Sequence, residues 1–300
     1  MRTLLYISFF LIGTVGQAQT AGQLLEKAYK KKSTEMLKQF FQNWNQEIRP
    51  ISDKELSTFN DTIRQTYSVF TAFYKPQNID SLGGSEWGND IYKNADFLII
   101  QDFIKIYFTD KLYWTEQETD DYIVDYINKN IEEVSTKQML LERTNGKLSE
   151  SVIENFSPNN SIFFERQDLL LDSIVNFRPR ININGKFPLY LSSKYNDILN
   201  AFLGNKHLPV GTGDIMTPAR SSRQSEKRKN FLNNYIKIWY GHWGGYWQLH
   251  SYPKAYSITF DKDMKYAKID FRMVYEGGEA LLKNDNGKWI LISAKRTWIE

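Results

Sequence analysis

The segment that decides the fold is the last part of the chain, "KYAKIDFRMVYEGGEALLKNDNGKWILISAKRTWIE" (Lys265–Glu300). Its first run alternates apolar residues with charged ones. The apolar residues are Ala267, Ile269, Phe271, Met273 and Tyr275, and the charged residues between them are Lys268, Asp270 and Arg272. Alternation with a period of two is typical of a strand that has one face on a core and the other in solvent or in a pocket.

Turn sequences divide this tail into strands. The segments "DKDM" (261–264), "EGG" (276–278) and "NDNG" (284–287) are rich in residues that favour turns, and they separate four apolar runs that begin with "AYSITF" (255–260). Before them, "RKNFLNNYIKIWY" (228–240) has its apolar residues at helical spacing. We therefore predict an α+β fold, with a C-terminal helix packed on a curved four-stranded antiparallel meander over residues 230–300.

This helix and the pattern "YEGGEALLKNDNGKWILIS" (275–293) resemble the C-terminal part of nuclear transport factor 2-like and cystatin-like domains. The resemblance covers about a quarter of the protein. It implies a cone-like sheet whose open end forms a pocket. Such domains serve as enzymes, binding proteins and assembly modules, and the resemblance implies no catalytic residue.

The N-terminus reads as a signal peptide over residues 1–18. Arg2 is followed by an apolar run that is too short to span a bilayer, and Gly16 and Ala18 are small residues at the positions that a signal peptidase requires. No cysteine follows, so this is not a lipoprotein leader. We predict an exported protein, periplasmic or extracellular, whose mature chain does not insert into a membrane.

Residues 19–204 are predicted to form an α+β N-terminal region. A helical pair at its start has apolar stripes over 37–48 and 56–74, and a mixed α/β middle follows. That middle contains a strand over 97–108, a helix that starts after Thr115, a hairpin at "RINI-NG-KFPLYL" (180–191) and a helix over 196–203. Residues 205–229 are rich in glycine, serine and charge, which predicts a linker or mobile loop.

Composition excludes several classes of function. The chain has no cysteine, so it has no disulfide framework, thiolate metal site or cysteine nucleophile. Its formal net charge is +3, and it falls by one unit without Arg2, which is too close to neutral to predict binding to nucleic acid. No motif indicates a cofactor or a metal, so we predict neither. The aromatic fraction of 15% favours a core of large rings, or ring platforms for flat ligands.

The stretch "GHWGGYWQLHSYP" (241–253) holds two of the three histidines and is the candidate site. Its glycines and rings also suit a purely structural junction between helix and sheet. Rings beside hydrogen-bonding groups are typical of sugar and small-ligand sites, and a histidine paired with Asp270 or Glu279 could act as a base. The candidate ligand-binding residues are His242, Trp243, Tyr246, Trp247, His250, Asp270, Arg272 and Glu279.

Three classes of function remain open. The first is an exported, non-catalytic protein that binds a small molecule, a glycan or a protein on the C-terminal sheet. The second is a metal-independent hydrolase or lyase that uses a histidine and a carboxylate at the mouth of the sheet. The third is a structural module that forms a homodimer.

Overall fold

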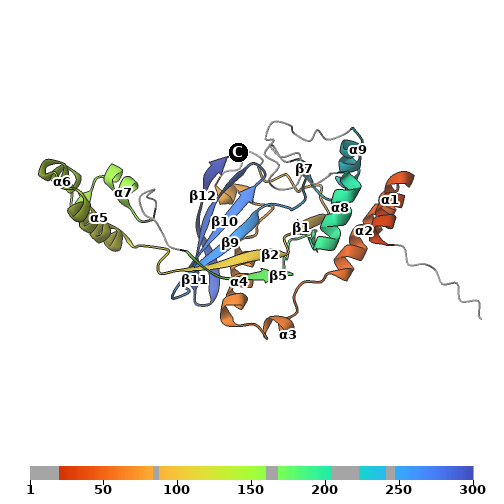
Figure 1. The fold of residues 1–300 in the computed structure, drawn as a ribbon, viewed down its shortest axis with the longest axis horizontal. Coiled ribbons are helices and arrows are strands. Elements are labelled where there is room, and N and C mark those ends of the chain that lie inside the picture. Colours follow the sequence, from red (N-terminus) through yellow and green to blue (C-terminus); the bar gives the residue numbers. More distant parts are fainter. Residues whose placement is uncertain (1–19, 84–87, 160–167, 205–222, 241–246, 300) are drawn as a thin grey trace, which may run out of the picture.

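The computed structural model describes residues 20–83, 88–159, 168–204, 223–240 and 247–299 (Figure 1). The predicted signal peptide lies outside these residues. The described chain combines helices with a large mixed sheet, so the predicted α+β class is confirmed. None of the described helices is long and apolar enough to cross a membrane.

A six-stranded sheet forms the centre of the molecule, in the order β12-β11-β10-β9-β2-β5. The four C-terminal strands form the predicted antiparallel meander. β2 runs parallel to β9, and β5, at the end of the sheet, runs antiparallel to β2. The strands of this sheet are β2 (Phe103–Thr109), β5 (Leu169–Val175), β9 (Lys254–Asp261), β10 (Tyr266–Met273), β11 (Glu276–Asp285) and β12 (Lys288–Ile299).

One predicted turn of the meander is instead part of a strand. The turn at Asn286-Gly287 forms, and both residues adopt positive φ. The segment "EGG", however, opens β11, and the β10–β11 turn lies at Val274, whose φ is 43°. Gly277 and Gly278 are needed for close packing, because a Cβ on Gly277 would lie 2.2 Å from the Trp298 ring. The register of β11 against β12 shifts between these two glycines.

One hydrophobic core lies between the meander and helix α4 (Asp61–Phe73). The rings of Phe73 and Phe271 are 5.3 Å apart, and the Trp289 indole donates to Gln65 at 2.7 Å. We predicted that the helix before the meander covers the sheet, and this is wrong. The helix that covers it comes from the N-terminal region, which also contributes the short helices α3 (Asp53–Leu56) and η1 (Ile79–Leu82).

A second core is built from helices that lie beside the sheet at the right of Figure 1. In it, the rings of Trp44 and Tyr195 stack at 4.2 Å, and the Trp44 indole donates to the carbonyl of Tyr190 at 3.0 Å. The elements of this core are α1 (Ala21–Lys31), α2 (Thr34–Glu47), α8 (Ser193–Leu203), α9 (Arg223–Leu232), β1 (Phe97–Ile100), β6 (Phe187–Tyr190) and β8 (Trp247–Gln248). β8 pairs with β7 (Trp239–Tyr240), whose Trp239 packs against the first core.

The N-terminal helical pair is α1 with α2. We predicted that the second helix of the pair covers 56–74, but this segment is divided at Asn60, which caps α4, and α4 belongs to the other core. Leu203 and Gly204 end α8 as predicted, with Gly204 in the left-handed conformation.

Helix α9 starts at Arg223, so residues 223–229 of the predicted linker are helical, and residues 205–222 lie outside the described chain. The helix ends at Leu232, earlier than predicted. Directly after it, the side-chain oxygen of Asn233 accepts a hydrogen bond from the backbone nitrogen of Ile238. Arg228 fixes α9 to the second core through an ion pair with Glu26 and a hydrogen bond to the Phe202 carbonyl.

The predicted strand over 97–108 is two strands that serve two sheets. β1 pairs in parallel with β6, while β2 belongs to the six-stranded sheet. Leu98 and Ile100 of β1 face the first core and Phe97 and Ile99 face the second, so β1 is covered on both faces as expected.

The same pairing explains why the predicted hairpin over 180–191 does not form. The Asn184-Gly185 turn is present, but β6 pairs with β1. The first arm of the expected hairpin lies instead against the start of α3, where Arg180 pairs with Asp53 and donates to the Ile51 carbonyl.

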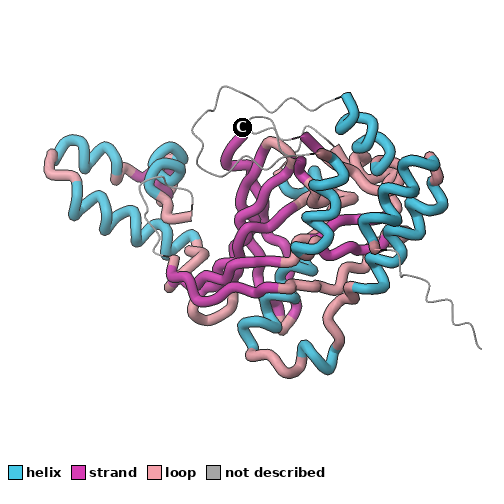
Figure 2. The backbone as a smooth tube through the Cα atoms, turned by 45° about the vertical axis from the view of Figure 1, so that its right-hand side comes forward, coloured by secondary structure: helices cyan, strands magenta, loops and turns pink. Residues whose placement is uncertain are grey.

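Between β2 and β5 the chain forms an arm that extends away from the sheet (Figures 1 and 2). The predicted capping box of Thr115 and Glu118 opens its first helix. The arm has its own small core, and its elements are α5 (Glu116–Asn130), α6 (Val134–Leu140), β3 (Arg143–Thr144), β4 (Lys147–Leu148) and α7 (Glu150–Phe156).

The close approach of β11 and β12 gives a testable prediction. A Cβ on Gly278 would lie 2.0 Å from the Lys295 carbonyl oxygen, which the paired backbone cannot avoid without separating the strands. Gly278→Ala should therefore lower the free energy of unfolding by at least about 2 kcal/mol in urea denaturation. Gly22→Ala in α1 is the control, because a Cβ there would lie 3.9 Å from its nearest neighbour, Ile198 of α8, and the change should stabilise the chain by about 0.5–1 kcal/mol. A Gly278→Ala variant as stable as the parent would contradict the packing described.

Candidate functional site

The candidate site lies where β9 begins, on the face of the sheet opposite the first core. Two cavities of about 330 and 380 Å³ meet there, and both are lined by Lys254, His250 and Tyr256. We call this pair of cavities the Lys254 cleft. The segment 247–253, the end of β10 and the start of α8 line the first cavity, and β2 lines the second. The remaining lining residues are Leu191, Asn196, Trp247, Gln248, Leu249, Tyr252 and Arg272 in the first, and Gln101, Asp102, Phe103, Lys105, Tyr107, Ala255 and Ser257 in the second.

Two cations face each other across the strands of this cleft. Lys254 and Arg272 are direct cross-strand partners in the β9–β10 pairing. Their Cβ atoms are therefore about 5 Å apart, and like charges in that position destabilise a sheet. Burial lowers the pKa of Lys254 from its ordinary value, and the charge of Arg272 lowers it further, while Asp102 acts in the opposite direction.

The partners of the Arg272 side chain include a backbone carbonyl, an amide and a ring. Its Nε donates to the Val274 carbonyl at 2.8 Å, and the guanidinium lies 5.6 Å from the centre of the Trp298 ring. The hydrogen-bonding pattern assigns the amide oxygen of Gln248 to the side that faces Arg272, where it accepts at 3.2 Å. These contacts orient the guanidinium as a fixed group of donors.

The ammonium of Lys254 is less constrained. It forms no ion pair and no side-chain hydrogen bond with any residue in the described ranges, and its Nζ lies 5.8 Å from the centre of the Tyr256 ring. A partly buried cation with unused donors is costly unless an anion approaches it. The cleft therefore has the charge and the free donors to accept a carboxylate or a phosphate.

Histidine and carboxylate groups in the cleft are shifted toward their neutral forms. Burial lowers the pKa of His250 to about 3, and the charge of Lys254 acts in the same direction. Burial raises the pKa of Asp102, against the opposing effect of Lys254. Near neutral pH the His250 imidazole is uncharged, so it serves as a hydrogen-bonding group and adds no positive charge.

The structure brings together three of the predicted site residues, Trp247, His250 and Arg272, around one cleft. Trp247 lines its edge, but its ring is buried in the second core, as the structural interpretation of this stretch expects. His242, Trp243 and Tyr246 lie outside the described residues.

Asp270 and Glu279 do not join His250 as predicted. Both carboxylates pair with the buried ammonium of Lys268, at 2.8 and 3.3 Å, and Asp270 also accepts from Ser257 at 2.9 Å. Along β10, Lys268 lies two residues before Asp270, on the same face of the strand. The carboxylates therefore neutralise a lysine that the sheet buries, and Glu279 lines a different cavity.

Sequence reasoning missed Lys254, Asp102 and Gln248. Asp102 and Lys254 are 152 positions apart in the sequence. They come close only because β2 lies parallel to β9. A signal for Lys254 was present: it is the one cation of its strand and directly follows Pro253, where the chain turns from the histidine-containing segment into the sheet.

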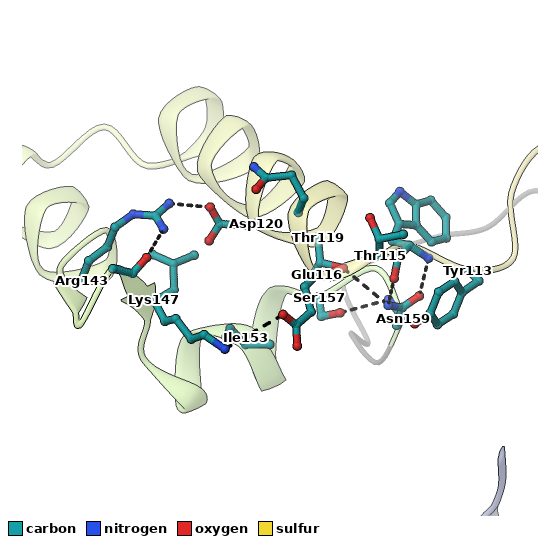
Figure 3. Close-up of a pocket in the computed structure, with 14 residues that line it drawn as sticks. Tyr113, Thr115, Glu116, Thr119, Asp120, Arg143, Lys147, Ile153, Ser157 and Asn159 are labelled. Atoms are coloured by element: carbon teal, nitrogen blue, oxygen red, sulfur yellow. Dashed lines mark hydrogen bonds and ion pairs between the residues drawn. The ribbon is translucent and has the colours of Figure 1, made fainter. Parts of the chain in front are cut away.

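A larger cavity, of about 670 Å³, lies in the arm between the start of α5 and the β3–β4 hairpin (Figure 3). Its polar groups satisfy one another. Arg143 pairs with Asp120 at 2.6 Å, and the Asn159 amide binds both backbone groups of Trp114, at 3.0 and 2.9 Å. Figure 3 shows these bonds joining the cavity walls, so this cavity is better explained by the cohesion of the arm than by a ligand.

Within the described ranges, no three histidine or acidic side chains lie together in a way that could hold a metal ion. Comparison of the chain with protein-family models, with curated proteins and with solved structures finds no match. The case for a function therefore depends on the geometry of the cleft.

The lowered pKa of His250 predicts acid sensitivity. Below about pH 6.5, the ordinary pKa of histidine, the unfolded chain binds a proton at residue 250, and the folded chain does not until about pH 3. The free energy of unfolding should therefore decrease as the pH is lowered through this window, by up to about 1.4 kcal/mol per pH unit. Urea denaturation near pH 7 and pH 5 should show a larger loss for the parent than for His250→Gln. Equal losses would contradict a His250 that stays neutral in the folded chain.

The opposed cations give a second prediction. Lys254→Met keeps the length of the side chain and removes its charge, so the repulsion from Arg272 and the cost of burying the ammonium both disappear. Without ligand, this variant should be more stable than the parent by about 0.5–1 kcal/mol. Thermal denaturation in low salt measures the difference, with Lys283→Met, an exposed lysine on β11, as the control. A destabilised Lys254→Met would mean that this ammonium supports the fold.

Proposed function

We propose that this chain is an exported binding protein whose Lys254 cleft takes a small organic anion, with the carboxylate or phosphate between Lys254 and Arg272 and an apolar or ring-shaped body over the neighbouring aromatic side chains. The observation that carries this proposal is the direct cross-strand placement of Lys254 opposite Arg272 in a cleft. An anion that binds both cations would lessen the repulsion between them, and charge-assisted hydrogen bonds to the two groups would add to the affinity.

The rings around the cleft support the second half of the proposal. Phe103 and Tyr256 are exposed large apolar side chains beside the second cavity, and Tyr107 of β2 also lines it. Ring faces next to charged donors suit a ligand with an apolar or sugar-like body and an acidic group. The combined size of the two cavities fits a small molecule better than a folded partner.

Export is part of the same proposal, and it is supported by the pattern of residues 1–18. The resemblance of the helix and meander to nuclear transport factor 2-like and cystatin-like domains supports a ligand at the open end of the sheet. In this reading the strands supply a stable frame, and the segment 247–253 with the β1–β2 junction supplies the ligand contacts.

Thermal denaturation with paired anionic and neutral compounds tests the proposal. We expect benzoate, phenyl phosphate or glucuronate to raise the melting temperature of the parent by a few degrees at saturation, and benzamide, phenol and glucose to leave it unchanged. The shift should be absent in Lys254→Met and preserved in Lys283→Met. Because phosphate alone supplies the charge without the body, inorganic phosphate should give a smaller shift than phenyl phosphate.

The result that would overturn the proposal is a melting temperature that responds to none of the anions, or one that responds equally in the parent and in Lys254→Met. Equal responses to benzoate and benzamide would mean that the rings bind the ligand and that the cations do not contribute.

A further inference from the structure

Two lysines on the open face of the meander have different surroundings. Lys268 is buried, and its ammonium pairs with the carboxylates of Asp270 and Glu279, at 2.8 and 3.3 Å. Lys254 is partly buried at the rim, where it lines both cavities of the cleft. Among the described residues, none forms an ion pair or a side-chain hydrogen bond with the nitrogen of Lys254. Lys268 is therefore occupied by its partners, while the nitrogen of Lys254 is available to a ligand.

The cleft favours the neutral amine of Lys254, which is the form of lysine that acts as a nucleophile. Burial lowers the pKa of Lys254, and the charge of Arg272, its cross-strand partner, lowers it further against the smaller effect of Asp102. A larger fraction of this lysine is therefore neutral at a given pH than of an ordinary lysine. Loss of solvent and a neighbouring cation are the two means by which proteins activate a lysine toward carbonyl compounds.

We propose that the Lys254 cleft binds a 2-oxo acid covalently, with the carboxylate on Arg272 and the carbonyl carbon joined to Nζ of Lys254 as an imine. This inference rests on the proposed function, because it uses the same anion site, and it adds the chemical class of the ligand. In a 2-oxo acid the carbonyl carbon is bonded directly to the carboxylate carbon. One molecule thus presents an anion and an electrophile side by side, as β9 and β10 present an amine and a guanidinium from directly opposite positions.

The bond changes in this step balance without another reactant. The ammonium of Lys254 first loses a proton, and the amine nitrogen attacks the carbonyl carbon, so that a C–N bond forms while the C–O double bond becomes a single bond. A second proton moves from this nitrogen to the oxygen. The first proton then returns to the oxygen, which leaves as water. The remaining N–H stays on a positively charged iminium, so the total charge is unchanged and nothing is oxidised or reduced.

Reduction with cyanoborohydride tests the imine, because it converts the imine into a stable amine that peptide mapping by mass spectrometry locates. We expect phenylpyruvate to label Lys254 more than the exposed Lys283 by about tenfold or more, since the bound ligand holds its carbonyl at the amine. Phenyllactate, which has a hydroxyl group in place of the carbonyl, should label neither lysine. Phenylacetone, which lacks the carboxylate, should label Lys254 much less than phenylpyruvate does. Benzoate should protect Lys254 in the parent by occupying the anion site.

Two variants separate this inference from the proposed function. Lys254→Arg keeps a cation and cannot form an imine, so benzoate should still raise its melting temperature while the selective labelling by phenylpyruvate disappears. Arg272→Gln keeps the amine and removes the guanidinium, so phenylpyruvate should label Lys254 no better than phenylacetone does.

Labelling of Lys254 no stronger than that of Lys283, in a parent that responds to benzoate, would overturn the imine and leave the anion site in place. A parent whose melting temperature responds to no anion, and whose Lys254 reacts equally with phenylpyruvate and phenylacetone, would overturn both proposals.

Discussion

The structure depends on how the chain crosses from one sheet to the other after β1. This strand forms the wall between the two cores, so its backbone cannot continue into the six-stranded sheet without a break. Gln101 makes that break possible, because its side-chain amide accepts from the backbone nitrogen of Ala255 at 2.8 Å and donates to the Ala255 and Phe103 carbonyls at 2.7 and 2.8 Å. A buried side chain thus replaces backbone hydrogen bonds that would otherwise be lost.

The location of the cleft follows from this crossing. Gln101 fixes β9 beside β2 at Ala255, which places Lys254 one residue earlier, at the rim. The next strand then brings Arg272 opposite it. Deeper in the sheet the same face neutralises its buried lysine, Lys268, with two carboxylates. The middle of this face therefore holds a structural ion pair, whereas Lys254 at its mouth forms no ion pair with a residue in the described part of the chain.

The extent to which sequence predicted the structure depended on how local the determining contacts are. The meander was predictable because alternation and turn residues act within each hairpin, and Asn286-Gly287 specifies its turn directly. The hairpin predicted at 180–191 was wrong although its turn forms. β6 pairs instead with β1, which lies about 90 residues earlier in the chain. Likewise, the sequence of α4 predicts an apolar face but does not indicate which of the two cores that face covers.

The candidate site shows the same division. His250 and Arg272 were predicted because they stand in or beside an unusual stretch, and Asp270 and Glu279 were wrongly joined to them because alternation gives the face of a side chain and not its partner. Lys268 accounts for both carboxylates, and its burial could not be read from a strand that looks amphipathic. The pKa of Lys254 depends on its burial and on the charges of Arg272 and Asp102, and only the tertiary fold creates these surroundings.

The arm between β2 and β5 has a consequence for how this fold can vary. Phe108 and Leu169 are paired neighbours, so the chain leaves the sheet and returns to it at almost one point. Everything between them, including a separate small core, is topologically a side branch. Lineages could therefore lengthen, exchange or lose this branch without altering the order of the strands, and a short loop in its place would still connect the same two strands.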